Sequence, residues 1–148
     1  MSRDPFEDGV VVSLTGDSYR TEALSGDHRV LLDEPGEAGG ENSGPSPIKL
    51  MLMSLGGCKA MTARMYAARK GWPLEGVIVS ARHELREPEG GGPKRAHIDV
   101  ELQILGDQLT DEQRERIAEI ADRCPVQKML ATETPLDVTH VVADAPPR

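Results

Sequence analysis

Two cysteines, Cys58 and Cys124, are the residues of this 148-residue chain whose type best suits covalent chemistry. The N-terminal segment is polar and acidic and has no apolar stretch typical of a secretory signal, so we expect a cytoplasmic location. In a reducing compartment a structural disulfide framework is not expected. The pair is therefore interpreted either as two buried thiols or as a redox couple.

The local sequence leaves two interpretations of Cys124 open. Pro125 suits the first position of a helix, which would make Cys124 its N-cap, where backbone N–H groups favour a thiolate. Alternatively, Cys124 continues the apolar stripe of Ile117 and Ile120 and is a buried, unreactive thiol.

Cys58 lies about three turns inside a predicted long helix, too far from its start to benefit from the helix dipole. The preceding Gly56-Gly57 pair costs about 1 kcal/mol per glycine relative to alanine. Such a cost indicates that a second helix or a substrate approaches closely. The alternative is tight helix packing, with Cys58 as a small core residue.

Other kinds of site are not predicted. The four histidines are scattered, and the sequence contains neither a Cys-x-x-Cys nor a His-x-x-x-His motif, so we expect no metal site. No motif indicates a cofactor. A net charge of −8 and the scarcity of aromatic residues argue against a nucleic-acid partner. The longest uncharged apolar run has nine residues, from Leu50 to Cys58, against the roughly 20 that span a bilayer. We therefore expect no membrane association.

The N-terminal half predicts a strand meander followed by a long helix. Three short apolar runs, 10–14, 19–24 and 29–32, are separated by glycine-containing turns. The helix is expected over 46–71, with Ser46 as N-cap and Pro47 in its first position. Its first half is apolar on every side, which indicates that protein surrounds it, including a second subunit.

The C-terminal half predicts two strands, two helices and a closing strand. Alternating runs at 77–86 and 96–104 form a hairpin in which Arg82 lies opposite Asp99. A capping box from Thr110 to Gln113 starts a helix, a short helix follows at 126–133, and a last strand is expected at 136–142. The order indicates a single α+β domain over 1–148 with an antiparallel sheet.

Two motifs together resemble the OsmC/Ohr family, and most closely an OsmC-like branch of it. The first is Gly-Pro-Ser-Pro at 44–47 followed by an apolar helix through Leu-Gly-Gly-Cys at 55–58 and Met-Thr-Ala-Arg-Met-Tyr-Ala at 61–67. The second is Ile-Ala-Asp-Arg-Cys-Pro-Val at 120–126. The resemblance covers about residues 10 to 143. It implies an OsmC-like fold, with an antiparallel sheet packed on a long central helix, and an intertwined homodimer with two interface sites.

The resemblance also implies a thiol-dependent peroxidase that reduces organic hydroperoxides. Cys58 takes the position of the peroxidatic cysteine, which becomes a sulfenic acid. Cys124 takes that of the resolving cysteine, which forms a disulfide that an external dithiol reduces. An arginine from the N-terminal strands holds the thiolate in this family, and Arg20 and Arg29 are the two candidates.

One position departs from the family pattern. Peroxidase members carry a glutamate ten residues before the first cysteine, where it orients the arginine, and this chain has Ile48 there. The departure motivates a second hypothesis. In it, the chain is a non-catalytic OsmC-like thiol protein that binds a small apolar ligand among methionine and leucine side chains.

Overall fold

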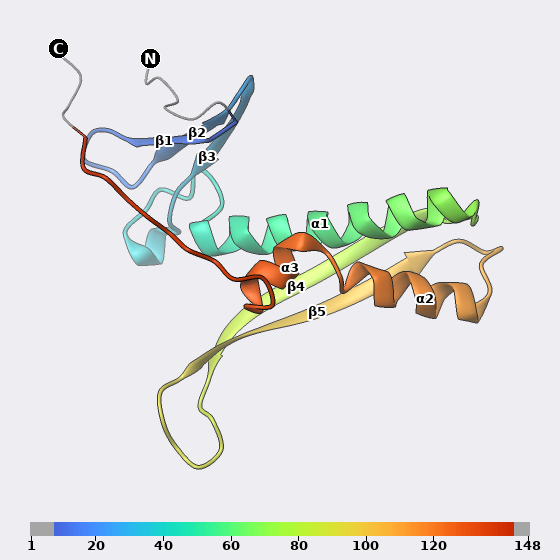
Figure 1. The fold of residues 1–148 in the computed structure, drawn as a ribbon. Coiled ribbons are helices and arrows are strands. Elements are labelled where there is room, and N and C mark those ends of the chain that lie inside the picture. Colours follow the sequence, from blue (N-terminus) through green and yellow to red (C-terminus); the bar gives the residue numbers. More distant parts are fainter. Residues whose placement is uncertain (1–7, 144–148) are drawn as a thin grey trace. The chain divides into compact units, whose positions relative to one another are not determined.

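The computed structural model describes residues 8–143, which form two compact units. The first comprises the residues up to Gly57 together with Val79–Gln103, and the second comprises Cys58–Ile78 with the residues from Ile104 onward. The helix α1 and the hairpin strands β4 and β5 have residues in both units (Figure 1). The predicted α+β class with antiparallel sheets is confirmed. The single domain over 1–148 stays a prediction.

The first unit begins with the predicted meander. Strands β1 (Val11–Leu14), β2 (Thr21–Ser25) and β3 (His28–Leu32) form an antiparallel sheet in the order β1-β2-β3. Gly26 turns β2 into β3 with φ +56°, a left-handed conformation that glycine adopts without strain. Alternation and turn residues therefore sufficed to predict this sheet.

A buried carboxylate organises the loop between β3 and α1, which contains the short 3-10 helix η1 (Gly36–Ala38). Asp33 accepts hydrogen bonds from the backbone N–H groups of Glu34, Glu41 and Ser43 and from the Ser43 hydroxyl, over 2.8–3.2 Å. These bonds, that of the Ser43 N–H first, hold the pKa of Asp33 below its usual value. At Gly44 a Cβ would lie 2.2 Å from the carbonyl oxygen of Leu31, so the Gly-Pro-Ser-Pro motif needs its glycine for close backbone packing.

Helix α1 (Pro47–Lys70) begins as predicted, because the Ser46 hydroxyl accepts a hydrogen bond from the Lys49 N–H at 3.3 Å. Its buried residues recur every three or four positions and form the inner stripe of the helix: Leu52, Leu55, Lys59, Ala63 and Ala67. Four large apolar side chains elsewhere on the helix are exposed, namely Ile48, Met53, Met61 and Met65. The single chain therefore leaves part of this helix uncovered. The expectation that a second subunit helps to surround its first half stays a prediction.

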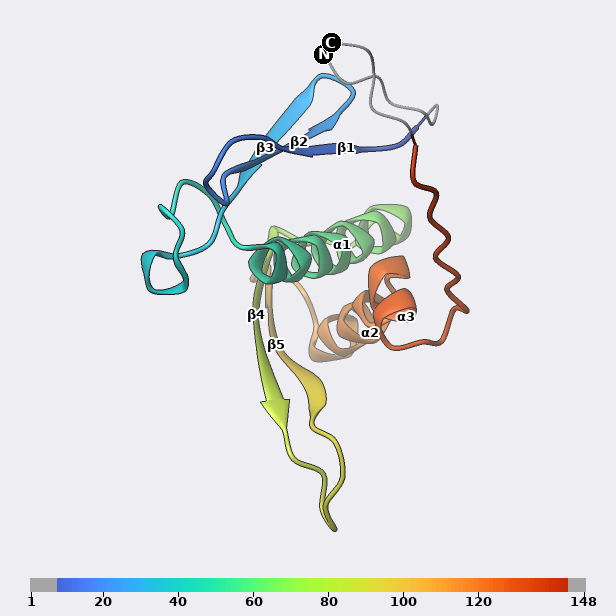
Figure 2. The same ribbon diagram turned by 90° about the vertical axis from the view of Figure 1, so that its left-hand side faces the viewer.

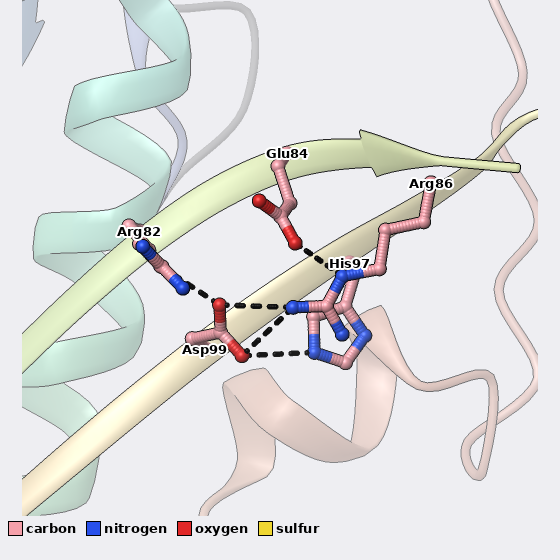
Figure 3. A network of polar contacts seen from close by, with 5 residues as sticks. All are labelled: Arg82, Glu84, Arg86, His97 and Asp99. Carbon is pink, nitrogen blue, oxygen red and sulfur yellow. Dashed lines mark hydrogen bonds and ion pairs between the residues drawn. The ribbon is translucent and has the colours of Figure 1, made fainter.

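Strands β4 (Gly76–Arg86) and β5 (Arg95–Leu105) pair as the predicted hairpin. Arg82 donates to Asp99 at 2.8 Å, which confirms the expected cross-strand charge pair. Figure 3 shows that the Asp99 carboxylate also contacts the Arg86 guanidinium and the His97 ring, each at 3.1 Å, and that Arg86 forms an ion pair with Glu84. The network is largely solvent-exposed, so it fixes the register of the strands more than it adds stability.

The helices of the second unit follow from their caps. The capping box of α2 (Asp111–Ala121) is complete: the Thr110 hydroxyl accepts from the Gln113 N–H at 3.1 Å, and the Gln113 side chain accepts from the Thr110 N–H at 3.0 Å. Helix α3 (Pro125–Leu130) has Pro125 in its first position, as one interpretation of Cys124 required, and it ends before the predicted residue 133. The C-terminal half of α1 lies beside α2 and α3 in both views (Figure 1, Figure 2).

The closing strand predicted at 136–142 is wrong. This segment is irregular, and its apolar side chains are exposed, with Leu136 at 63% and Val141 at 93%. Among the described residues, the two sheets consist of β1–β3 and of β4–β5, and neither pairs with this segment. Alternation alone does not make a strand, because the backbone groups of a strand need a neighbouring ladder.

The Thr110 cap gives a test of the fold. Because Thr110→Ala leaves the Gln113 N–H at the start of α2 without its partner, we expect the free energy of unfolding to fall by about 1 kcal/mol. Urea denaturation measures the change. Thr134→Ala, an exposed threonine outside the helices, is the control, and an equal effect of both substitutions would contradict the role of the cap.

Candidate functional site

The two cysteines lie in the second unit and meet there. Cys58 is on α1 and partly exposed, Cys124 is the N-cap residue of α3 and fully buried, and both are free thiols. Cys58 lies close enough to Cys124 to contribute to the raised pKa of the Cys124 thiol. The fold thus brings together two thiols that are 66 positions apart in the sequence. Their roles in a reaction stay a prediction.

Cys124 combines the two interpretations that its local sequence left open. Its sulfur caps α3 by accepting the Gln127 N–H at 3.4 Å, and it also lies fully buried next to the stripe of Ile117 and Ala121. Burial raises the pKa of the Cys124 thiol and outweighs the lowering by the Gln127 N–H and by the positive charge of Lys59. The cap position thus favours the thiolate as expected, but burial has the larger and opposite effect on the pKa of Cys124.

Lys59 is a residue of this site that the sequence analysis missed. It is 2% exposed, and its ammonium donates to Asp122 Oδ1 at 2.8 Å and to the side-chain oxygen of Gln127. Asp122 caps the end of α2 and Gln127 belongs to α3, so both flank Cys124 along the chain. The available signal was the position of Lys59 on the inner stripe of α1, where the other residues are apolar.

Within residues 8–143, the glycine pair before Cys58 meets no second helix. A Cβ on Gly56 would touch Val79 at an ordinary 3.6 Å, and a Cβ on Gly57 would find nothing within 4 Å. The expected close approach of another helix is thus not found among the described residues. Instead, Gly57 leaves open space immediately before the partly exposed Cys58.

The candidate arginines belong to the first unit. Arg29, on β3, forms an ion pair with Glu22 at 2.5 Å. Arg20 precedes β2 and lines a pocket of about 310 Å³ together with Ser13, Thr15, Ser18, Glu22 and Leu31. These contacts describe the surroundings of each arginine within its own unit. The assignment of either one to the Cys58 thiolate stays a prediction.

Residues 8–143 contain neither of two further classes of site. No group of three or more His, Cys, Asp or Glu side chains is arranged there to hold a metal ion. None of the helices in that part of the chain has the length and apolarity that a bilayer span requires. The two free thiols are chemically suited to thiol oxidation and thiol–disulfide exchange.

Comparison with known proteins gives a family match. The model of the family described as OsmC-like protein matches residues 40–139. Comparison with curated proteins found no significant match.

Solved structures similar to this one cover most of both chains. An OsmC-like protein from Mycoplasma pneumoniae has a TM-score of 0.69 at 18% identity, over 86% of this chain and 89% of its own. An organic hydroperoxide resistance protein OsmC from Legionella pneumophila has a TM-score of 0.61 at 21% identity, over 86% and 91%. A putative organic hydroperoxide resistance protein from Vibrio cholerae, with captopril bound in one of its active sites, has a TM-score of 0.62 at 19% identity, over 86% of each chain.

The different burial of the two thiols predicts different reactivity. With limiting iodoacetamide at about neutral pH, we expect Cys58 to be alkylated well before Cys124, because Cys124 is buried and its pKa is raised. Peptide mapping by mass spectrometry over time measures both sites. Protein unfolded in guanidinium is the control, in which both cysteines should react alike, and faster labelling of Cys124 in the folded protein would contradict the geometry.

Proposed function

Because the chain belongs to the OsmC-like protein family, we propose that it is a two-cysteine peroxidase that reduces organic hydroperoxides in the cytoplasm. The observation that carries the proposal is the adjacency of a partly exposed thiol, Cys58, and a buried thiol, Cys124. The names of two structural neighbours, both organic hydroperoxide resistance proteins, support the choice of substrate.

The proposed reaction starts at Cys58, which is the more accessible sulfur. Its thiolate attacks the outer oxygen of the hydroperoxide, the O–O bond breaks, and Cys58 becomes a sulfenic acid. The alkoxide leaves and takes up a proton from solvent to become an alcohol. The sulfur of Cys124 then attacks that of Cys58. An S–S bond forms, the S–O bond breaks, and the hydroxide leaves as water with the proton of Cys124. An external dithiol completes the cycle by reducing the disulfide.

We further propose that the active form is a homodimer. Met53, Met61 and Met65 are each about 60% exposed in the single chain, which is unusual for apolar side chains on a long helix. A second copy that covers them would also surround the apolar first half of α1. Light scattering at micromolar concentration tests this proposal: a dimer mass is expected, and a monomer mass would contradict it.

The dimer also bears on Ile48, which takes the place of the family glutamate. Ile48 precedes Cys58 by ten residues on α1, which corresponds to about 15 Å along the helix axis. A side chain at position 48 is thus too distant to orient an arginine at the thiol of its own chain. In the proposed dimer, an arginine from the N-terminal strands, Arg20 or Arg29, holds the Cys58 thiolate at the interface.

A second candidate function rests on the same position. Ile48 is 46% exposed and supplies no carboxylate, so the arginine lacks the partner that orients it in peroxidase members. Without that partner, the Cys58 thiol would react with peroxides only as a free thiol does. The chain would then bind a small apolar ligand without turning it over.

Oxidation kinetics separate the two functions. With cumene hydroperoxide we expect rapid formation of a Cys58–Cys124 disulfide, at least about tenfold faster than with hydrogen peroxide, because the exposed side chain of Met61, one turn further along α1, offers an apolar contact to an organic substrate. Stopped-flow kinetics give the rates, and intact mass with peptide mapping identifies the disulfide. Equally slow oxidation by both peroxides, without a disulfide, would favour the binding function.

Matched variants assign the two sulfurs. Cys124→Ser should stop at a sulfenic acid on Cys58 that dimedone traps, whereas Cys58→Ser should give neither product. Ile48→Glu restores the family carboxylate. If that variant alone reacts quickly, the isoleucine is what has removed peroxidase activity from the natural chain.

A further inference from the structure

Lys59 is a buried charge at a position where the fold otherwise places apolar side chains. It lies on the inner stripe of α1 between Leu55 and Ala63, and its side chain is 3% exposed. An ammonium group is costly to bury unless other groups compensate for its lost hydration. The contacts of Lys59 are therefore a requirement of the fold in this unit.

Those contacts hold both sides of the turn between α2 and α3, residues 122–127, which is the corner that carries Cys124. Asp122 precedes Cys124 by two residues, and its carboxylate accepts a hydrogen bond from the Lys59 ammonium at 2.8 Å. Gln127 follows it by three residues, accepts from the ammonium through its side chain and donates its own N–H to the Cys124 sulfur. Lys59 also follows Cys58 directly on α1. One side chain thus connects the helix of the first thiol to the corner of the second.

We propose that Lys59 is a positioning residue for thiol–disulfide exchange between Cys58 and Cys124. Through Asp122 and Gln127 it holds the Cys124 sulfur toward Cys58, and its positive charge stabilises the negative charge that this sulfur gains in the exchange. The proposal deepens the proposed function, since it concerns the second step of that reaction. It does not depend on which oxidant acts on Cys58.

The charge of Lys59 matters in both directions of the exchange. When the disulfide forms, Cys124 loses its proton before it attacks the Cys58 sulfur. When an external dithiol reduces the disulfide, its thiolate attacks Cys58, the S–S bond breaks, and Cys124 leaves as a thiolate. A thiolate of lower pKa leaves faster, so a nearby positive charge favours this outcome. The second thiol of the reductant then closes a disulfide in the reductant and releases Cys58.

The negative charge of Asp122 should affect Cys124 in the opposite direction to the positive charge of Lys59. The proposal can therefore be tested by the direction in which each substitution changes the reactivity of Cys124. Its side chain is 69% exposed, so Asp122→Asn should preserve the fold and the hydrogen bond while it removes the negative charge. Around Cys124, Cys58 and Lys59 lie on α1 and Asp122 lies at the end of α2, and the Gln127 N–H contributes a dipole. Arg123, which is exposed, and Lys128, on α3, are also close to Cys124 along the chain. Lys59→Met and Asp122→Asn should therefore change the reactivity of Cys124 in opposite directions, whereas a purely structural role would predict the same direction.

The experiment measures alkylation of Cys124 against pH in the full chain carrying Cys58→Ser, with mass spectrometry as the readout. Near pH 7.5, Lys59→Met should slow the reaction roughly three- to tenfold, Lys59→Arg should restore most of the rate, and Asp122→Asn should speed it roughly twofold or more. Lys49→Met, an exposed lysine in the first turn of α1, is the matched control and should change nothing.

A second readout is the rate at which diamide, a thiol oxidant that is not a peroxide, forms the Cys58–Cys124 disulfide. With Cys58 present, Lys59→Met should slow it and Asp122→Asn should not. Unchanged rates in both variants, or slower rates in both, would overturn the proposal. If Lys59→Met does not fold, Asp122→Asn decides alone, since only a faster alkylation supports the proposal. Both readouts are independent of peroxide, so failure of the proposed function would leave them interpretable.

Discussion

The cost of burying one ammonium group constrains the second unit of this protein. Lys59 is placed on the inner stripe of α1, and the free energy of removing its charge from water has to be offset by Asp122 and Gln127. These partners come from the end of α2 and from α3, so the turn between the two helices has to lie against α1. The small residues Ala63 and Ala67, which continue the stripe, let another element pack closely. The position of Cys124 follows from this arrangement.

What the sequence predicted correctly consists mainly of local interactions. The start of α1 at Ser46 and Pro47 and the capping box at Thr110 depend on groups within a few residues of each other. The Arg82–Asp99 pair joins two strands of one hairpin, where alternation restricts the possible registers. In each case the free energy that decides the structure is already present in a short stretch of chain.

The features that the sequence did not predict depend on distant groups. The alternation at 136–142 resembles a strand, but a strand requires a partner, and within the described residues the segment has none. The helical periodicity of the sequence did not reveal the partners of Lys59, because Asp122 and Gln127 lie more than 60 positions away in the chain. At Cys124 both local interpretations described real contacts. Their opposite effects on the pKa could be ranked only once the burial of the sulfur was known.

The different surroundings of the two sulfurs explain how one chain can separate the two steps of the proposed reaction. A peroxide has to approach a sulfur directly, and Cys58 is partly exposed, whereas Cys124 has no exposed surface. Burial keeps the Cys124 sulfur from direct contact with solvent and raises the pKa of its thiol, so it should react more slowly than Cys58 with molecules in solution.

The same burial would hinder Cys124 when it has to attack the oxidised Cys58, because the attacking form is the thiolate. A positive charge that is fixed nearby and shielded from water reduces this cost without exposing the sulfur. Lys59 has that position, since it is buried and held by two hydrogen bonds next to the corner of Cys124. Burial of Cys124 and burial of Lys59 are therefore best understood as one arrangement, in which the lysine keeps a protected thiol able to react with Cys58.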